Sequence, residues 1–331
     1  MFSATAYRTV REHVAFLDRL DRGLIVVSGS DRATYLQGLL TNDIVGLKSG
    51  TGCYAAYLTP QGRMITDLFV YELGDVILLA LPRPQKDAVL AKLDQLVFSE
   101  DVQLGDVTET FLATAIVGPS APATLANILG LAADDLRAMP EHGNLRAAFE
   151  DRPVILTRTN DTGVMGFDVY VESAKADVFR IALVGNGIQN LDPETAEVVR
   201  IEAGIPKFNQ DMDEDTIPLE AGIESRAISF SKGCYVGQEV IIRVIHRGHG
   251  RVARKLAGLV VEGETSPSIG ARVMSNDREI GKVTSAAVSP TLNKPIALAY
   301  LHRDFLAEGT AVMIDGVEAL VERLPFVKTE Q

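Results

Sequence analysis

The sequence predicts an α+β fold with a large N-terminal region, residues 1–250, and a small C-terminal β-barrel, residues 251–331. Two observations support this interpretation. After residue 249, six short strand-like runs separated by turn residues follow within about 75 residues, which is typical of a small closed or nearly closed barrel. Before residue 250, strands and helices mix without the regular alternation of a βαβ fold. The change of pattern places a domain boundary near residue 250.

Apolar runs and turn residues predict the elements of the large region. Residues 23–28 form a buried strand, and Ser30 or Asp31 can cap the next segment, where leucines recur at helical spacing. Residues 54–58 and 65–73 are two strands joined by the hairpin turn 59–62. Asp192 and the proline after it mark the start of a helix. Further strands are expected at 76–81, 111–117, 153–157 and 167–171, and helices at 85–97, 124–131 and 193–203.

The barrel is predicted from period-2 patterns and hairpin signals. Asp315-Gly316 is a strong two-residue turn signal, and Asn276-Asp277 is a weaker one. Its strands are expected at 256–261, 271–274, 279–287, 295–301, 310–314 and 317–323.

Composition excludes several classes of protein. No uninterrupted apolar stretch approaches the roughly 18–20 residues of a membrane-spanning helix, and residues 1–11 lack the pattern of a signal peptide. We therefore expect a cytoplasmic protein without membrane contact. Two cysteines form neither a disulfide framework nor a self-contained four-cysteine metal or iron–sulfur site, so no resident metal is expected. The net charge of −12 argues against direct nucleic-acid binding.

Charge is distributed unevenly near the end of the large region. An acidic run covers residues 211–215, and a basic run covers residues 243–255. These are either two solvated faces or a local anion site beside the cysteine at position 234. The basic run contains Arg243, His246, Arg247, His249, Arg251, Arg254 and Lys255.

The stretch KGCYVGQE, residues 232–239, leaves two interpretations of Cys234 open. Lys232 and a helix expected from about Gln238 would both favour a thiolate. Gly233 and Gly237 would allow a tight turn. The alternative is a small buried residue in a glycine-rich turn. Cys53 enters a predicted strand and is expected to be a packed core residue.

Three carboxylates are candidate ligand-binding groups. Asp43 ends the first helix, either as a turn residue or as a carboxylate that orients an amine or imine nitrogen. Glu202 lies near a helix C-terminus, which is unfavourable for a negative charge and suggests a purpose. Asp168 alternates with apolar neighbours along a strand and would face either a ligand or solvent.

Several longer stretches resemble the glycine-cleavage T-protein (aminomethyltransferase) superfamily over about residues 22–325. They are LQGLLTND (36–43), GFDVYV (166–171), RIEAGIPKFNQDMDEDTIPLEAGI (200–223) and GKVTSAAVSPTLNKPIALAYL (281–301). Within that superfamily, residues 232–239 followed by Arg243 resemble the signature K-G-C-[FY]-x-G-Q-E-x-x-x-R of the YgfZ-like folate-binding branch. The motif members are Lys232, Gly233, Cys234, Tyr235, Gly237, Gln238 and Glu239.

The resemblance implies a three-part ring, two α+β lobes and a barrel, around a central pocket for tetrahydrofolate or a one-carbon derivative. It implies that Asp43 faces the reactive edge of the folate, and that Asp168 and Glu202 pair with pterin N–H donors. Asp168 stands where the family usually has Glu, which shortens its reach. From charge alone, Arg226 or Arg243 would receive the anionic glutamate tail.

Two functions follow as hypotheses. The first is a folate-binding accessory factor that uses Cys234 in assembly or repair of iron–sulfur enzymes, including radical-SAM and tRNA-modifying types; its partners would be iron–sulfur assembly proteins or the client enzymes. The alternative is a folate-dependent aminomethyl or one-carbon transferase like the T-protein, with Asp43 at its centre. A folate store is a third, weaker interpretation. A monomer is expected.

Overall fold

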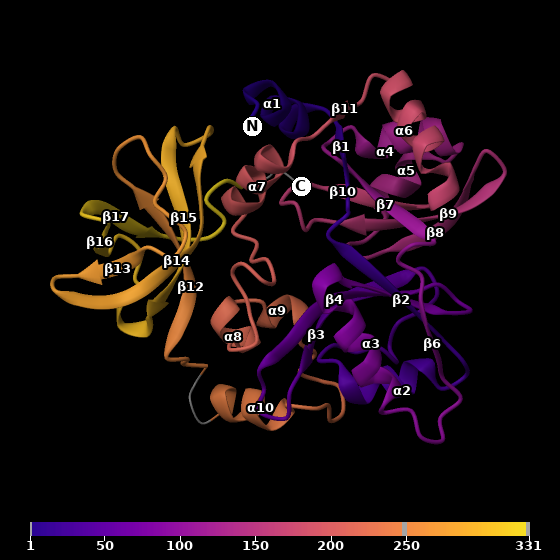
Figure 1. Cartoon of the computed structure of the whole chain (residues 1–331), viewed down its shortest axis with the longest axis horizontal. Helices are drawn as coiled ribbons and strands as arrows, with labels where there is room; N and C mark the ends of the chain where they lie inside the picture. The colour runs from indigo at the N-terminus through magenta and orange to yellow at the C-terminus, as the bar shows by residue number, and fades with distance from the viewer. Residues whose placement is uncertain (1, 247–249, 329–331) are drawn as a thin grey trace.

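The computed structural model describes residues 2–246 and 250–328, which form three parts around a common centre (Figure 1). Two lobes of sheet and helix lie on one side and a closed β-barrel lies on the other. Three helices occupy the space between them: α7 (Pro193–Glu202), α8 (Pro218–Ala221) and α9 (Glu224–Ala227). The prediction of an α+β fold with a C-terminal barrel is confirmed.

Lobe 1 is built on a five-stranded antiparallel sheet with strand order β3-β4-β5-β2-β6. Apolar side chains of α2 and α3 pack on one face, and the other face packs against residues 208–228 and α10 (Gln238–His246). Its elements are β2 (Arg22–Ser28), α2 (Arg32–Leu39), β3 (Thr51–Leu58), β4 (Met64–Glu72), β5 (Ile77–Pro82), α3 (Lys86–Asp94) and β6 (Gln103–Asp106).

Lobe 2 is built on a six-stranded sheet with order β11-β1-β7-β10-β9-β8. Helices α4, α5 and α6 contribute to the core of this lobe, whereas α1 and α7 pack towards the barrel. Its elements are α1 (Ala4–Glu12), β1 (Ala15–Asp18), β7 (Phe111–Val117), α4 (Ala121–Leu129), α5 (Ala133–Ala138), β8 (Asn144–Phe149), β9 (Arg152–Thr159), β10 (Gly166–Glu172), α6 (Ala176–Gly185) and β11 (Gln189–Asn190).

The two lobes are interleaved along the chain. Strand β1 belongs to the sheet of lobe 2, and the next strand along the chain, β2, belongs to the sheet of lobe 1. Residues 19–21 therefore cross from one lobe to the other, and the chain returns to lobe 2 between β6 and β7. The first crossing places charged residues where the lobes meet.

The barrel closes in the order β12-β15-β14-β13-β16-β17. Asp315 and Gly316 both have positive φ, 51° and 82°, as the predicted hairpin turn requires. All six predicted strands are present: β12 (Arg254–Val261), β13 (Arg272–Ser275), β14 (Arg278–Ser289), β15 (Lys294–His302), β16 (Ala311–Ile314) and β17 (Val317–Glu322).

Helices differ most from the sequence prediction. The helix expected at 85–97 ends earlier, at Asp94, and the one expected at 124–131 begins earlier, at Ala121, before a proline in its first turn. Helix α6 was not predicted, and its N-cap residue, Lys175, makes no side-chain cap. Asp31 stands at the N-cap of α2, but its carboxylate accepts from the Asp101 amide instead. In the described chain, no helix has the length and apolar character needed to cross a membrane.

Candidate functional site

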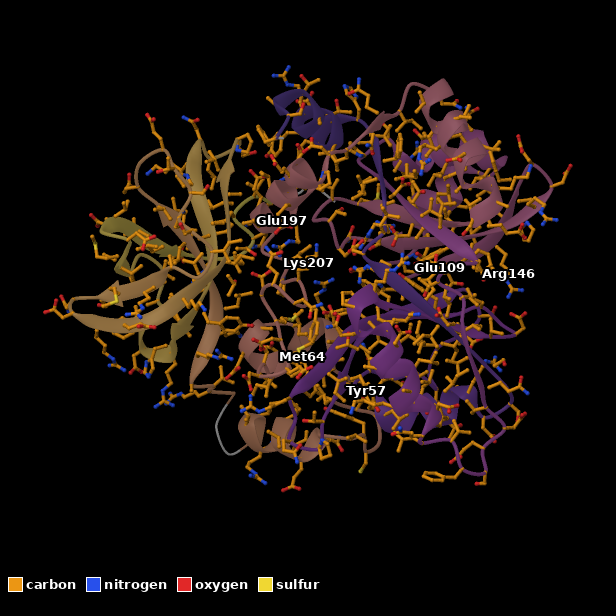
Figure 2. All side chains as sticks on the ribbon, viewed as in Figure 1. Tyr57, Met64, Glu109, Arg146, Glu197 and Lys207 are labelled. Carbon is orange, nitrogen blue, oxygen red and sulfur yellow. The ribbon has the colours of Figure 1, made fainter. Side chains whose placement is uncertain are left out.

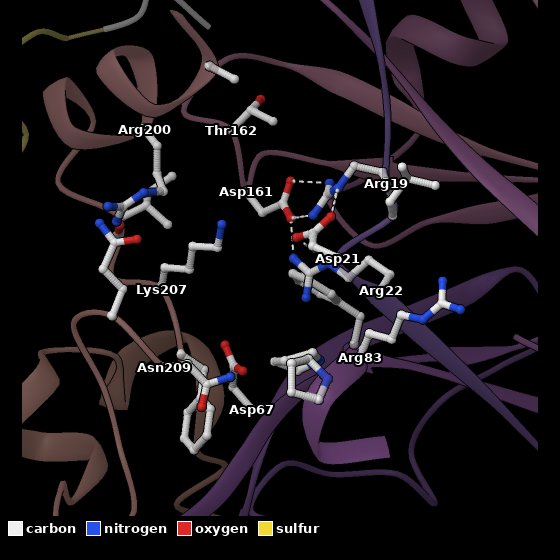
Figure 3. A pocket seen from close by; sticks show the side chains of 18 of the residues that line it. Arg19, Asp21, Arg22, Asp67, Arg83, Asp161, Thr162, Arg200, Lys207 and Asn209 are labelled. Carbon is white, nitrogen blue, oxygen red and sulfur yellow. Dashed lines mark hydrogen bonds and ion pairs between the residues drawn. The ribbon is translucent and has the colours of Figure 1, made fainter. Parts of the chain in front are cut away.

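A cavity of about 910 Å³ lies where the two lobes meet α7 and the chain that follows it (Figure 3). Its wall contains the crossing segment 17–22, residues 82–87, side chains from β3 and β4, and parts of 193–210. Among the described residues, those of the barrel strands add nothing to this wall. Helix α7 and residues 205–212 separate the barrel from the cavity.

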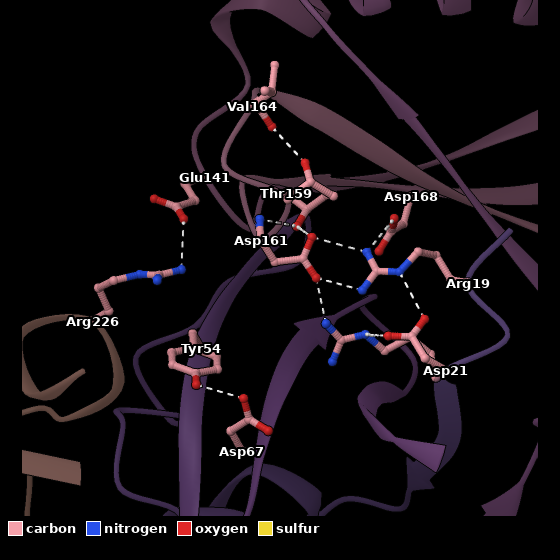
Figure 4. Close-up of polar contacts among 12 residues, drawn as sticks. Arg19, Asp21, Tyr54, Asp67, Glu141, Thr159, Asp161, Val164, Asp168 and Arg226 are labelled. Carbon is pink, nitrogen blue, oxygen red and sulfur yellow. Dashed lines mark hydrogen bonds and ion pairs between the residues drawn. The ribbon is translucent and has the colours of Figure 1, made fainter. Parts of the chain in front are cut away.

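Two arginines from the crossing segment share one aspartate at the edge of the cavity (Figure 4). The Arg19 guanidinium donates to both Asp161 oxygens, at 3.1 and 2.7 Å, and Arg22 donates to Asp161 Oδ2 at 2.5 Å. Asp21 accepts from Arg19 Nε at 3.3 Å. Although burial acts in the opposite direction, the two arginines hold the pKa of Asp161 well below the usual range of a carboxyl. The network therefore fixes the loop before β10 to the crossing between lobes.

Asp168 lies behind this network. Its Oδ1 accepts from Arg19 Nη1 at 3.4 Å, a longer contact than the Asp161 bonds. Burial raises the pKa of Asp168 to about 6, and ionised Asp161 adds to that shift while Arg19 opposes it. Asp168 is not part of the cavity wall, whereas Arg19 and Asp161 are. The structure thus gives Asp168 a protein cation as its nearest charged partner.

Asp67, on β4, is a carboxylate of the cavity wall with spare hydrogen-bonding capacity. Tyr54 donates its hydroxyl to Asp67 Oδ2 at 2.8 Å. Asp67 Oδ1 is buried and accepts from no other described residue. Burial raises the pKa of Asp67 above its ordinary value, with Arg22 and the Tyr54 hydroxyl acting in the opposite direction. This covered oxygen therefore keeps unused acceptor capacity in a residue of the cavity wall.

Aromatic and apolar side chains surround this carboxylate. Tyr54, Phe69 and Phe208 all contribute to the cavity wall. The Arg226 guanidinium stacks 5.3 Å from the centre of the Tyr54 ring and lies 3.7 Å from Glu141. An aromatic wall with one open carboxylate suits a flat heterocycle that carries N–H donors.

Two charged residues of the cavity wall differ from the others because they form no ion pair with a described residue. In the described chain, Asp67 and Lys207 are the cavity-lining charged residues without an opposite charge within 4 Å. Lys207 lies in the central region between the three parts of the molecule (Figure 2). The remaining lining charges form pairs, among them Arg180 with Asp18, Arg83 with Glu109, Lys86 with Asp87, Arg200 with Glu197, and Arg19 with Asp21.

Comparison with protein families identifies this architecture. A family model described as GCVT N-terminal domain matches residues 2–232, and one described as glycine cleavage T-protein C-terminal barrel domain matches residues 254–328. The chain belongs to the glycine cleavage T-protein family. The match to both models agrees with the lobes and barrel of the structure.

Individual relatives in the glycine cleavage T-protein family extend over nearly the whole chain. An aminomethyltransferase of Streptomyces coelicolor is 31% identical over 97% of this chain and 88% of its own length. One of Bacillus subtilis is 29% identical over 97% and 90%. The crystal structure of the glycine cleavage system aminomethyltransferase T from Bartonella henselae superposes with a TM-score of 0.89, covering 98% of this chain and 89% of that one at 24% identity. That structure shows the shared fold.

Glu202 lies outside the cavity of this T-protein fold. It is fully buried, and its carboxylate accepts from the hydroxyls of Tyr7, at 2.7 Å, and Ser289, and from the guanidinium of Arg11. These partners come from α1 and from the end of β14. The Glu202 carboxylate therefore joins α1, α7 and the barrel, and this placement does not support pterin binding by Glu202.

Asp43 also lies away from the cavity wall. Its Oδ1 accepts from Gln37 Nε2 at 2.9 Å and from the Gly46 amide at 3.3 Å, as a turn residue does. These contacts match the turn-residue interpretation of Asp43, and its role at the reactive edge of a folate stays a prediction.

Lys232 uses all three of its N–H donors on the end of α2. Its Nζ donates to the carbonyls of Gln37, Leu40 and Asn42 at 2.6, 2.7 and 2.8 Å. Burial lowers the pKa of Lys232 to about 8, while the charge of Asp43 acts in the opposite direction. The lysine charge is thus placed at a helix C-terminus, where a cation is favourable.

The two cysteines have opposite environments. Cys234 is exposed, whereas Cys53 is buried in the lobe 1 core, where burial raises the pKa of its thiol to about 12. The expectation for Cys53 is confirmed. The interpretation of Cys234 as a buried residue is wrong, because its segment runs over the surface of lobe 1.

The two glycines of the 232–239 segment have different roles. Gly237 has φ +84°, and a Cβ there would lie 2.6 Å from the Thr59 carbonyl oxygen. Gly233 has no positive φ, and a Cβ there would meet open space. Tyr235, between them, is buried. The segment is therefore packed against the β3–β4 turn at Gly237 but not at Gly233.

The basic run beyond this segment is only partly described. The expected helix is present as α10, and Arg243 on it pairs with Glu239 at 2.6 Å, outside the cavity wall. Arg247 and His249 lie outside the described residues. Within the described ranges, no group of three His, Cys, Asp or Glu side chains is placed to hold a metal ion.

Sequence reasoning missed Asp67, Lys207 and the Arg19–Asp161 network. A signal for Asp67 was present, since an aspartate inside the apolar run 64–73 is disfavoured in a strand and costly to bury. Lys207 carried no such signal. Arg19 and Asp161 are 142 residues apart, and only the fold brings them together.

Proposed function

We propose that this protein binds a reduced folate in the central cavity and transfers a one-carbon unit to or from it. The observation that carries the proposal is Asp67 Oδ1, a buried carboxylate oxygen without a partner on another described residue, in an aromatic cavity wall. Its family membership and relatives named aminomethyltransferase support the same chemistry.

The cavity fits a folate in chemistry and in scale. Its volume of about 910 Å³ lies in the range of roughly 300–1,000 Å³ that small-molecule sites occupy. The flat face of the pterin ring matches the aromatic rings of Tyr54 and Phe69. Its N–H donors match the acceptor on Asp67. The Arg226 guanidinium, stacked on Tyr54, closes the same wall.

Tetrahydrofolate would supply the nitrogen atoms that carry the one-carbon unit. The chain supplies position and charge. Asp67, whose pKa burial raises, is suited to hold a ligand N–H and to accept a proton from it. Tyr54 fixes the other Asp67 oxygen and so orients the free one. Catalysis would come from positioning and electrostatics.

Titration calorimetry with (6S)-tetrahydrofolate under anaerobic conditions tests the proposal. We expect Asp67→Asn to weaken binding roughly 10- to 100-fold, as loss of a charged hydrogen bond does, and to abolish one-carbon transfer. Asp43→Asn is the matched control, since Asp43 lies outside the cavity wall. An unchanged affinity in Asp67→Asn, or a loss confined to Asp43→Asn, would overturn the assignment.

A second candidate function rests on Cys234. The motif resembles that of the YgfZ-like branch, and its thiol is exposed while Lys232, Tyr235 and Gly237 serve packing. We therefore also propose a folate-binding accessory role in iron–sulfur enzyme assembly or repair, in which a client or assembly protein meets the Cys234 thiol.

Complementation separates the two functions. In a strain that lacks this protein, the accessory role predicts that Cys234→Ser loses iron–sulfur enzyme activity while folate affinity is unchanged. The transferase role predicts that Cys234→Ser is silent and that Asp67→Asn loses function. Loss in both variants would mean that the folate site serves the accessory role.

A further inference from the structure

Lys207 is a cation of the cavity wall that has no ion-pair partner among the described residues. Its side chain extends into the cavity from the chain that follows α7, and Asp67 enters from the β4 side (Figure 3). No carboxylate of the described chain lies within 4 Å of its ammonium group, whereas every other described cation of the wall has such a partner.

The backbone around Lys207 is held rigidly. Its amide donates to Asp211 Oδ2 at 3.0 Å, and its carbonyl accepts from the amides of Gln210, Asp211 and Met212 at 3.2, 2.8 and 3.1 Å. Asp211 is itself bound by Arg200 and by barrel hydroxyls. Lys207 is exposed, and its side chain projects from this fixed backbone position at the cavity wall.

The surrounding charges indicate what Lys207 can bind. Against the effect of burial, neighbouring arginines lower the pKa of Asp21 and of Glu197, and Lys207 adds to both shifts from a greater distance. Each of these carboxylates already pairs with an arginine. An anion that entered the cavity would find Lys207 as the cation with free donors. A ligand that satisfies the wall must carry both an N–H donor for Asp67 and a negative group for Lys207.

We propose that Lys207 binds a glutamate-tail carboxylate of the folate, which sets the direction in which the ligand lies. This inference rests on the proposed function. The pterin end would face Asp67 and the tail would run towards residues 205–210. The sequence analysis expected Arg226 or Arg243 to bind the glutamate tail, and Lys207 takes that role in this proposal. Arg243 lies outside the cavity wall, and Arg226 pairs with Glu141 and stacks on Tyr54.

The test combines truncation of the ligand with substitution of the residue. Calorimetry compares (6S)-tetrahydrofolate with tetrahydropteroate, which lacks the glutamate, on wild type, Lys207→Met, Lys207→Arg and the surface control Lys175→Met. We expect Lys207→Met to weaken tetrahydrofolate binding about tenfold, as loss of one charge-assisted hydrogen bond does, and to leave tetrahydropteroate binding unchanged. Lys207→Arg should restore most of the affinity, and Lys175→Met should match wild type.

A fragment makes the test independent of the pterin site. Ligand-observed NMR with p-aminobenzoyl-glutamate and p-aminobenzoate asks whether Lys207 recognises the tail by itself. Binding of the glutamate fragment to wild type but not to Lys207→Met supports the inference even if Asp67→Asn shows that the proposed function is wrong. Equal effects of Lys207→Met on both folates, or fragment binding that is absent from wild type or unaffected by the substitution, would overturn it.

Discussion

The central cavity and the 232–239 segment use their charges in opposite ways. In the segment, Lys232 places its three donors on carbonyls at the end of α2, and the thiol is the group left exposed. In the cavity, most charges form ion pairs, and Asp67 and Lys207 are the lining residues of the described chain without an opposite charge within 4 Å. In the sequence, a lysine two residues before a cysteine was the more conspicuous feature. In the described chain, however, the cavity-lining charges without an ion-pair partner are Asp67 and Lys207.

The largest effect should come from breaking the cavity network. Arg19→Met removes the buried guanidinium that contacts Asp161 and Asp168. Because buried charges then lose their partner, we expect the free energy of unfolding to fall by about 3–5 kcal/mol. Urea denaturation measures this. Arg152→Met, which removes an exposed pair with Glu172, is the control and should cost less than about 1 kcal/mol. Equal effects would show that the network does not hold the lobes together.

The next effect belongs to the 232–239 segment. Lys232→Met leaves three carbonyls at the end of α2 without their donor, and we expect a loss of about 2–3 kcal/mol in the free energy of unfolding. Lys175→Met is the surface control. The alkylation rate of Cys234 should change little, because the substitution removes a clamp on α2. A slower alkylation without loss of stability would restore the view that Lys232 activates the thiol.

Two glycines of the segment sharpen the comparison further. Gly237→Ala forces a Cβ into a left-handed conformation 2.6 Å from a carbonyl oxygen, and we expect it to cost about 2 kcal/mol. Gly233→Ala should lie within about 0.5 kcal/mol of wild type, because Gly233 has no positive φ and a Cβ there would meet nothing within 4 Å. Thermal unfolding of both variants measures this. A loss of stability in Gly237→Ala alone means that the segment is packed only at Gly237, and a loss in both variants means that it is packed throughout.

The last effect has the opposite sign, because it is a gain of stability in the cavity network. Burial raises the folded-state pKa of Asp168 to about 6, against about 3.9 when unfolded, so its ionisation costs stability as pH rises from about 4 through 6. Asp168→Asn should therefore be more stable than wild type at pH 7 by up to about 3 kcal/mol, and the difference should vanish below about pH 4. Denaturation curves across this range measure it. A loss of stability at pH 7 would instead make Asp168 an ionised partner that Arg19 needs.

Local patterns predicted much of the fold. Period-2 runs and the Asp315-Gly316 turn located the barrel strands, and Asp192 caps α7 as expected by accepting from the Thr195 amide. Helix α6 lacks a capping side chain and was missed, and α1 was missed although the Ser3 side chain caps it by accepting from the Ala6 amide. The site was harder, because a cavity is defined by residues distant in sequence. Local reasoning found carboxylates but had no means to tell the open acceptor of Asp67 from the satisfied oxygens of Glu202.

The crossing between lobes has a consequence for how the chain is made. All five strands of lobe 1 lie within residues 22–106, so that sheet can form as soon as this stretch has left the ribosome. Strand β1 precedes it, yet its neighbours β7 and β11 are synthesised about 100 and 170 residues later. Strand β1 must therefore wait, unpaired, while lobe 1 is translated; β7 then becomes available to pair with it, and β11 joins its other edge only at the end of lobe 2.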